Sequence, residues 1–213
     1  MLSGCRQAIV FVEGTNDMLF LSMLAPENYV VKDVDRHVIN QAVWECEIED
    51  RECLVMTSLE GIGNVEKTIE RIVKWFKVLG PNICVILLVD SDEKDPIDRL
   101  QRYVEQLRLP GKVRRYHDRF FAYHCLIDAK DEVKLCMASW RCCAECWIAL
   151  LLPENPVTSL DSCDSNLRKL CHDVVREANV DARMLKSLWE NVGEPWKGIF
   201  SRLASQIRDA ELS

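Results

Sequence analysis

Residues 84–92 read CVILLVDSD, an apolar run that leads directly into two aspartates. An uninterrupted apolar run of strand length is typical of a strand buried on both faces, as in a parallel sheet. A second run, QAIVFV at residues 7–12, ends in the same way at Glu13. We therefore expect these two segments to be parallel strands of an α/β sheet, each ending in an acidic residue.

Strand-like and helix-like segments alternate on either side of these two runs. Strands are expected at residues 7–12, 30–34, 42–48, 53–57 and 84–89, and helices at residues 17–24, 65–76 and 96–107. Further strands are expected within residues 113–127 and at 147–152, followed by helices at residues 166–178, 182–191 and 195–210. This order predicts an α/β fold with a mostly parallel sheet flanked by helices, and a helical C-terminal extension.

The length of 213 residues suits one α/β domain with a modest extension. We assign residues 1–130 to the α/β domain. Residues 131–213 would supply a remaining strand and the C-terminal helical region, packed on or beside that domain.

Three acidic residues follow the two apolar runs: Glu13 after the first, and Asp90 and Asp92 after the second. Ligands of open α/β sheets bind outside the carboxyl ends of the strands, so these side chains would converge there. Clustered carboxylates favour a cation, and oxygen ligands suit Mg²⁺ or Mn²⁺. The alternative is structural, because acidic residues after strands also serve as helix caps and turn formers.

Glycines near these acidic residues suggest a place for phosphate. Gly14 follows Glu13 and would leave room for a phosphate to approach the backbone. Gly61, Gly63 and Asn64 precede the expected helix at residues 65–76, where backbone N–H groups could face an anion.

These motifs resemble the TOPRIM (topoisomerase–primase) family. VFVEGTNDMLFL at residues 10–21 is similar to its opening strand with Glu-Gly, and ILLVDSD at residues 86–92 to its D-x-D strand. GIGN at residues 61–64 is similar to the intervening glycine motif. The resemblance covers about residues 7–130, and the chain looks most like small solitary prokaryotic TOPRIM proteins. It implies magnesium at the two aspartates and the glutamate as general acid or base.

The resemblance leads to two functional hypotheses. The first is a metal-dependent nuclease or related phosphodiester enzyme acting on DNA or RNA. The second is a non-catalytic TOPRIM subunit of a repair or RNA-processing complex. The charge of −7, from 27 Lys and Arg against 34 Asp and Glu, lacks the basic excess usual in nucleic-acid binders. Local basic clusters, bound metal or a protein partner would have to offset it. A phosphoacceptor or nucleotide-binding α/β domain is a weaker third hypothesis, because the usual acid pair of a receiver domain lies elsewhere and the sequence contains no Walker-type lysine loop.

Eleven cysteines leave three possibilities open: buried thiols, intracellular disulfides or a zinc site. Cys143 and Cys146 form a C-x-x-C pair, but no second pair stands at a standard zinc spacing. No apolar run approaches the roughly 20 residues of a membrane-spanning helix, and we find no signal-peptide pattern. We therefore expect a soluble, cytoplasmic protein.

Overall fold

The computed structural model describes residues 7–25, 29–35, 37–59, 67–68, 83–106, 108, 113–115, 121–127, 133–153, 157 and 159–191. The strands are β1 (Gln7–Val12), β2 (Val30–Asp33), β3 (Cys53–Ser58), β4 (Ile83–Asp90), β5 (Arg114–Arg115), β6 (Phe121–Ile127) and β7 (Val133–Trp140). The helices are α1 (Thr15–Leu24), α2 (Ile39–Ile48), α4 (Pro96–Gln106), α5 (Ala144–Ala149), α6 (Ser165–Ala178) and α7 (Ala182–Asn191).

All seven of these strands form one sheet, in the order β2-β3-β1-β4-β7-β6-β5. The first five in that order are parallel to one another, whereas β6 and β5 join antiparallel. In the register between β1 and β4, Val12 lies opposite Leu88. The carboxyl ends of these two strands therefore lie at the same edge of the sheet.

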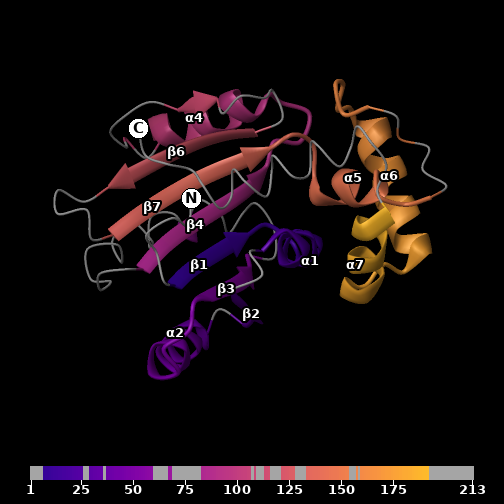
Figure 1. Cartoon of the computed structure of the whole chain (residues 1–213). Coiled ribbons are helices and arrows are strands. Elements are labelled where there is room, and N and C mark those ends of the chain that lie inside the picture. Colours follow the sequence, from indigo (N-terminus) through magenta and orange to yellow (C-terminus); the bar gives the residue numbers. More distant parts are fainter. Residues whose placement is uncertain are drawn as a thin grey trace.

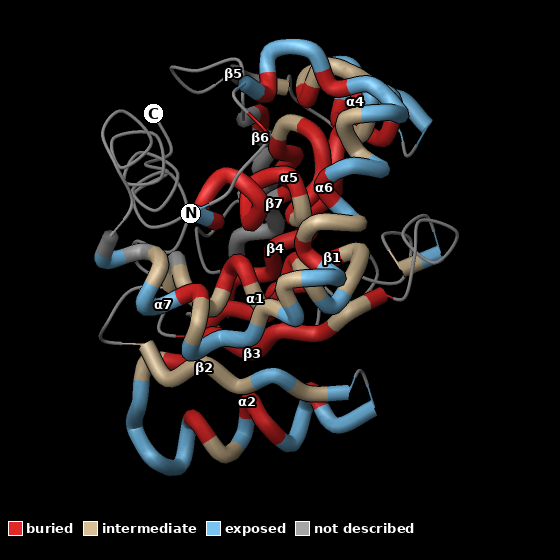
Figure 2. Tube along the Cα trace, turned by 90° about the vertical axis from the view of Figure 1, so that its right-hand side faces the viewer, coloured by how far each residue is buried: buried red, intermediate tan, exposed pale blue. Residues whose placement is uncertain are grey.

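Helices cover both faces of the sheet. One core joins alternate residues of β1 and β4, such as Val10 and Ile86, to buried residues of α1, α5, α6 and α7. The other core joins the intervening residues, such as Ile9 and Val85, to α2 and α4. Figure 1 shows α5, α6 and α7 gathered beside α1, away from α2 and α4. The central strands β1, β3 and β4 are buried, whereas β2 at the margin of the sheet is only partly buried (Figure 2).

The structure confirms the predicted α/β fold with a mostly parallel sheet and flanking helices. The expected helices at residues 17–24, 96–107, 166–178 and 182–191 match α1, α4, α6 and α7. The expected helix at residues 195–210 lies outside the described residues, as does most of the one at 65–76. The division of the chain at residue 130 stays a prediction.

The strand predicted at residues 42–48 is wrong, because this segment belongs to α2. The buried residues of α2 are Ile39, Ala42, Val43 and Cys46, which follow helical spacing. Trp44 is 59% exposed, so the alternation that suggested a strand counted a solvent-facing tryptophan as a core residue.

The strand predicted at residues 147–152 is also wrong, because α5 occupies residues 144–149 and a turn follows. Five of its six residues are buried, so the helix has almost no polar face by which periodicity could identify it. The sheet instead contains β7, which lies between β4 and β6 and was not predicted.

Two disulfides join cysteines whose side chains are described. One links Cys46 of α2 to Cys53 of β3, and the other links Cys142 to Cys163. The second ties the turn after β7 to the segment before α6. No helix in the described part of the chain combines the length and the apolar character needed to cross a membrane.

Candidate functional site

The carboxyl edge of β1 and β4 gathers the three acidic residues singled out in the sequence. Glu13 directly follows β1, Asp90 is the last residue of β4, and Asp92 lies two residues further on. The guanidinium Nη2 of Arg99 lies 3.5 Å from Glu13 Oε1 and 3.7 Å from Asp92 Oδ2. One cation therefore stands between two of the three carboxylates.

Glu13 is mostly removed from water, with 13% of its side chain exposed. Its contact with Arg99 lacks hydrogen-bond geometry, and Oε1 has no hydrogen-bond partner among the described residues. Burial raises the pKa of Glu13 to about 7; Arg99 opposes this shift, and the charge of Asp92 adds to it. Glu13 can therefore exist in both protonation states near neutral pH, as a group that transfers protons must.

Asp90 is buried and held by a tryptophan. Trp140 Nε1 of the neighbouring strand β7 donates a hydrogen bond to Asp90 Oδ1 over 2.5 Å. Burial, followed by the nearby charge of Asp17, raises the pKa of Asp90 well above its ordinary range, and the bond from Trp140 opposes that shift. Two adjacent carboxyl groups in a dry site favour sharing a proton or binding a cation.

Asp17 is a fourth acidic member of the cluster that the sequence analysis left out of the site. It lies in the first turn of α1, buried, and its Oδ2 accepts the N–H of Gly14 over 2.7 Å. Burial raises the pKa of Asp17 to about 7, and the Gly14 bond opposes that shift. Its position four residues after Glu13, in the first turn of the helix that begins at this edge, is the signal that could have identified it.

Gly14 makes room for Asp17. A Cβ at this position would lie 3.2 Å from Asp17 Oδ2, closer than most such contacts, and the glycine N–H is already used by the same carboxylate. Phosphate binding by Gly14 stays a prediction. Gly61, Gly63 and Asn64, the other expected phosphate-binding residues, lie outside the described residues.

Asp92 lies on a turn and not on an extension of β4. Its φ of 55° is in the left-handed region, which aspartate tolerates better than most residues. Its N–H donates to Cys142 O over 3.1 Å, which fixes the turn against the segment after β7. Its Oδ1 pairs with Arg168 Nη2 of α6 at 2.8 Å. The Asp92 carboxylate nevertheless lies near Glu13, because Arg99 Nη2 contacts both carboxylates.

Both arginines were missed in the sequence. Arg99 is buried in α4 and lies over the ring of Tyr103, 5.3 Å from its centroid. Its Nε and Nη2 have no hydrogen-bond partner among the described residues. Arg168 of α6 lies 76 positions after Asp92 in the chain, so no local pattern links the two. Sequence spacing could not have placed Arg168 in this site.

The donor set fits a divalent cation. Four carboxylates, those of Glu13, Asp17, Asp90 and Asp92, face two guanidinium groups, so the cluster has two excess negative charges when all six groups are ionised. All the acidic ligand atoms are oxygens, which Mg²⁺ and Mn²⁺ prefer. The unpartnered Glu13 Oε1 is a buried acceptor that a metal-bound water could satisfy.

A cleft of about 260 Å³ adjoins the cluster at the carboxyl ends of β2 and β3. Thr15, next to Gly14, and Ser58, whose Oγ donates to Glu13 O over 3.4 Å, connect it to the site. Asp33 and Asp35 also line the cleft. Their charges would repel a phosphate, so an anionic group would be favoured on the side of Arg99 and Arg168.

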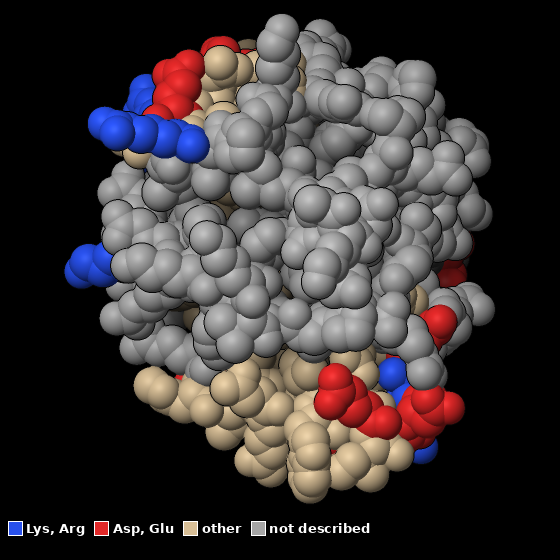
Figure 3. Space-filling model, turned by 90° about the vertical axis from the view of Figure 1, so that its left-hand side faces the viewer, with Lys and Arg blue, Asp and Glu red and all other residues tan. Residues whose placement is uncertain are grey.

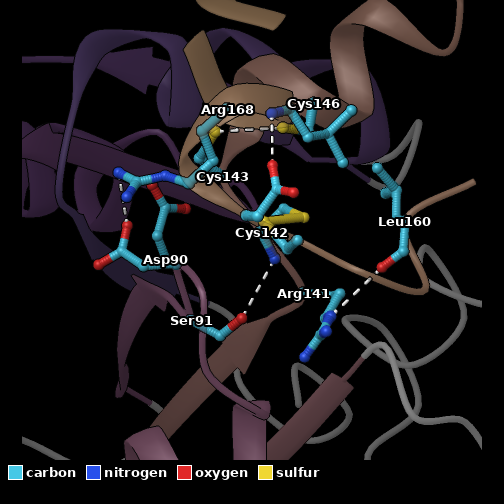
Figure 4. Close-up of a disulfide and its surroundings, with 12 residues drawn as sticks. Asp90, Ser91, Arg141, Cys142, Cys143, Cys146, Leu160 and Arg168 are labelled. Atoms are coloured by element: carbon cyan, nitrogen blue, oxygen red, sulfur yellow. Dashed lines mark hydrogen bonds and ion pairs between the residues drawn. A yellow bond between two sulfur atoms is a disulfide. The ribbon is translucent and has the colours of Figure 1, made fainter. Parts of the chain in front are cut away.

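A second group of polar side chains borders the carboxylates where α5 meets α6. It contains Cys143, Cys146, Glu145 and His172. The hydrogen bond from Cys146, helped by one from His172, lowers the pKa of Cys143 to about 6. Figure 4 shows Cys143 and Cys146 facing each other, with Arg168 beside Cys143.

No protein-family model, curated protein or solved structure matches this chain. The resemblance to TOPRIM proteins therefore depends on the quoted motifs and stays a hypothesis.

Proposed function

We propose that this chain is a TOPRIM-like, metal-dependent enzyme that acts on phosphodiester bonds of nucleic acid. The observation that carries the proposal is the convergence of Glu13, Asp90 and Asp92 at the carboxyl edge of two adjacent parallel strands. Buried carboxylates destabilise a fold unless a cation or proton compensates them, so their concentration at a ligand-binding edge favours a functional role.

Asp90 and Asp92 are the proposed ligands of Mg²⁺ or Mn²⁺. A bound ion of this kind would stabilise negative charge that develops on a phosphate and would orient the attacking oxygen. Trp140 holds the Asp90 carboxylate in place, and the turn anchored at Cys142 holds Asp92. The two ligands are thus fixed by the fold before any substrate binds, which lowers the reorganisation that catalysis requires.

Glu13 is the proposed general acid or base. It takes a proton from the attacking oxygen or gives one to the leaving oxygen, and its carboxylate has an unpartnered oxygen for that purpose. The positive charge of Arg99 beside Glu13 lowers the pKa of this carboxyl group against the effect of burial, and so favours its charged form.

Arg168 and Arg99 are the proposed phosphate contacts. A guanidinium donates to phosphate oxygens with the same geometry as to a carboxylate, so Arg168 can exchange Asp92 for a phosphate. On the face drawn in Figure 3, the described basic side chains lie in separate groups, some of them beside acidic side chains. Phosphate binding would therefore depend on these arginines at the site and on residues outside the described ones.

The deciding experiment is a cleavage assay on single- and double-stranded DNA and RNA with Mg²⁺ or Mn²⁺. The wild type is compared with Glu13→Gln and with the double variant Asp90→Asn/Asp92→Asn. Loss of a general base typically costs about 100- to 10,000-fold in rate, so Glu13→Gln should fall in that range. Asp98→Asn, an exposed aspartate of α4, is the matched control and should keep wild-type activity. Equal cleavage by all four proteins would contradict the proposal.

One observation favours the alternative, a non-catalytic TOPRIM subunit. Asp92 is already paired with Arg168 at 2.8 Å and lies 3.7 Å from Arg99, so part of the charge that would attract a metal is neutralised within the chain. Under this alternative a folded sample neither binds Mg²⁺ nor cleaves any of the four nucleic acids. The same double variant would then retain binding to its protein partner.

A further inference from the structure

The second polar group lies at the junction of α5 and α6, beyond the carboxylate cluster. Cys143 caps the start of α5, Glu145 lies in its first turn, and His172 comes from α6. One sulfur, one carboxylate oxygen and one ring nitrogen of these residues all lie within 4.8 Å of one another. Two helices thus bring together three side chains that each offer a metal ligand.

The chemistry of these donors differs from that of the carboxylate cluster. Thiolate and imidazole ligands select zinc over magnesium, and a carboxylate is accepted beside them. Ligand atoms around a tetrahedral zinc ion lie about 3–4 Å apart, since the bonds are about 2.0–2.3 Å long. We propose that Cys143, Glu145 and His172 bind a zinc ion, with Cys146 as the fourth ligand.

Cys146 is not one of the three residues whose ligand atoms all lie within 4.8 Å of one another, so it would have to move toward Glu145 and His172 to join them as the fourth ligand. Its Sγ lies 3.5 Å from Cys143 Sγ, within the range of two sulfurs bound to one zinc ion (Figure 4). The C-x-x-C spacing puts both sulfurs at the start of the same helix. The second pair that was missing from the sequence comes instead from Glu145 and from His172 of α6.

Two simpler explanations account for fewer of these contacts. Cys143 and Cys146 could be core thiols next to an ordinary ion pair, since His172 is 48% exposed and its Nδ1 lies 3.3 Å from Glu145 Oε1. That explanation does not require a ligand atom of each partner to lie within 4.8 Å of Cys143 Sγ as well. The two cysteines could also exchange disulfides with a partner, but both are almost completely buried, and such exchange requires access to the attacked sulfur. Glu145 is held in place by Asn16, whose Nδ2 donates to Oε1 over 2.7 Å.

The proposed zinc site also borders the carboxylate cluster through α6. Arg168 lies four residues before His172, so both side chains project from the same face of the helix. A metal that fixes His172 against α5 would also fix the position from which Arg168 reaches Asp92. The zinc ion would be structural, while the carboxylates keep their own role.

The test uses the full chain, purified in a phosphine reductant without chelator. We expect one zinc per chain by mass spectrometry of the metal content, and two sulfur ligands by X-ray absorption. Cobalt in place of zinc should give a sulfur-to-metal charge-transfer absorption. A folded wild type that retains no zinc, or a cobalt form without that absorption, overturns the proposal whatever the variants do.

Variants assign the ligands by competition with a chromophoric chelator. Cys143→Ser and His172→Ala should each weaken zinc binding by more than the roughly 10- to 100-fold that loss of an outer-shell partner costs. His37→Ala, an exposed histidine, is the matched control. Asp90→Asn/Asp92→Asn should keep its zinc, which separates this site from the carboxylate cluster. Zinc lost from that double variant but kept by His172→Ala would contradict the proposal, and a single sulfur ligand would overturn the assignment of Cys146.

Discussion

Arg168 Nη2 lies 2.8 Å from Asp92 Oδ1, and this ion pair joins α6 to the turn that follows β4. It connects the C-terminal helices to the edge of the sheet where the other acidic residues lie. The pair also competes with any cation for the same carboxylate, which makes it the first contact to remove.

Replacement of Arg168 by alanine should strengthen binding of Mn²⁺ to the carboxylate cluster. A partly exposed ion pair is worth about 0.2–1 kcal/mol, so the affinity should rise by up to about fivefold. Isothermal titration with Mn²⁺ measures this change, and Arg183→Ala, an exposed arginine of α7, is the control. Weaker binding in Arg168→Ala would show that the arginine supports the site and does not compete with the metal.

Divalent metal should stabilise the wild type against unfolding. A ligand that binds only the folded state, at 100 times its dissociation constant, adds about 2.7 kcal/mol. Thermal denaturation with and without Mg²⁺ should therefore show a rise in the Tm of the wild type. This rise should be absent in Asp90→Asn and retained in Asp98→Asn. An equal rise in Asp90→Asn would place the metal elsewhere.

The stability of the metal-free protein should fall as the pH rises from about 4 to about 7. The folded-state pKa of Asp17 is raised from 3.8 to about 7, so the folded chain holds a proton that the unfolded chain releases. The contribution of this group is complete below pH 3.8 and is lost as the pH passes through 7. The free energy of unfolding, measured by urea denaturation, should differ less between pH 5 and pH 8 for Asp17→Asn than for the wild type. Parallel pH dependence in the two proteins would contradict the assignment.

Replacement of Trp140 by phenylalanine should destabilise the protein by roughly 1–3 kcal/mol, because Asp90 loses a buried donor. The indole also packs edge-on against Phe20, with ring centroids 5.2 Å apart, and phenylalanine keeps part of that contact. Chemical denaturation measures the change. Trp44→Phe, which alters an exposed tryptophan, is the matched control and should have little effect. Equal effects of the two substitutions would rule out a specific role for the indole N–H.

The central part of the fold could be predicted because β1, β3 and β4 are apolar on both faces and end in turns. The strands and helices that were misassigned lack that contrast. In α2 the exposed Trp44 completes an alternation of apolar and polar residues that is typical of a strand. In α5 nearly every residue is buried, so the sequence shows no helical periodicity. β7 contains Lys134 and Ser139, which interrupt its apolar run although the strand lies inside the sheet.

Three of the four acidic residues of the candidate site, all but Asp17, could be predicted from the sequence because strand ends in a parallel sheet share one edge. The prediction that Glu13 and Asp90 lie close together required only that rule and the correct pairing of β1 with β4. Arg168 could not be predicted, because it reaches the site through the packing of α6 on α5. The same packing brings His172 to Cys143, which no spacing in the sequence indicates.

The two outermost strands of the sheet, β2 and β5, have four and two residues. An edge strand presents unpaired N–H and C=O groups, and long exposed edges are the usual templates for aggregation and strand exchange. Among the described residues, each of these two outermost strands by itself offers an incoming strand only a few backbone hydrogen bonds. The strand order in turn keeps β1 and β4, which are almost entirely apolar, in the interior of the sheet and away from its edges.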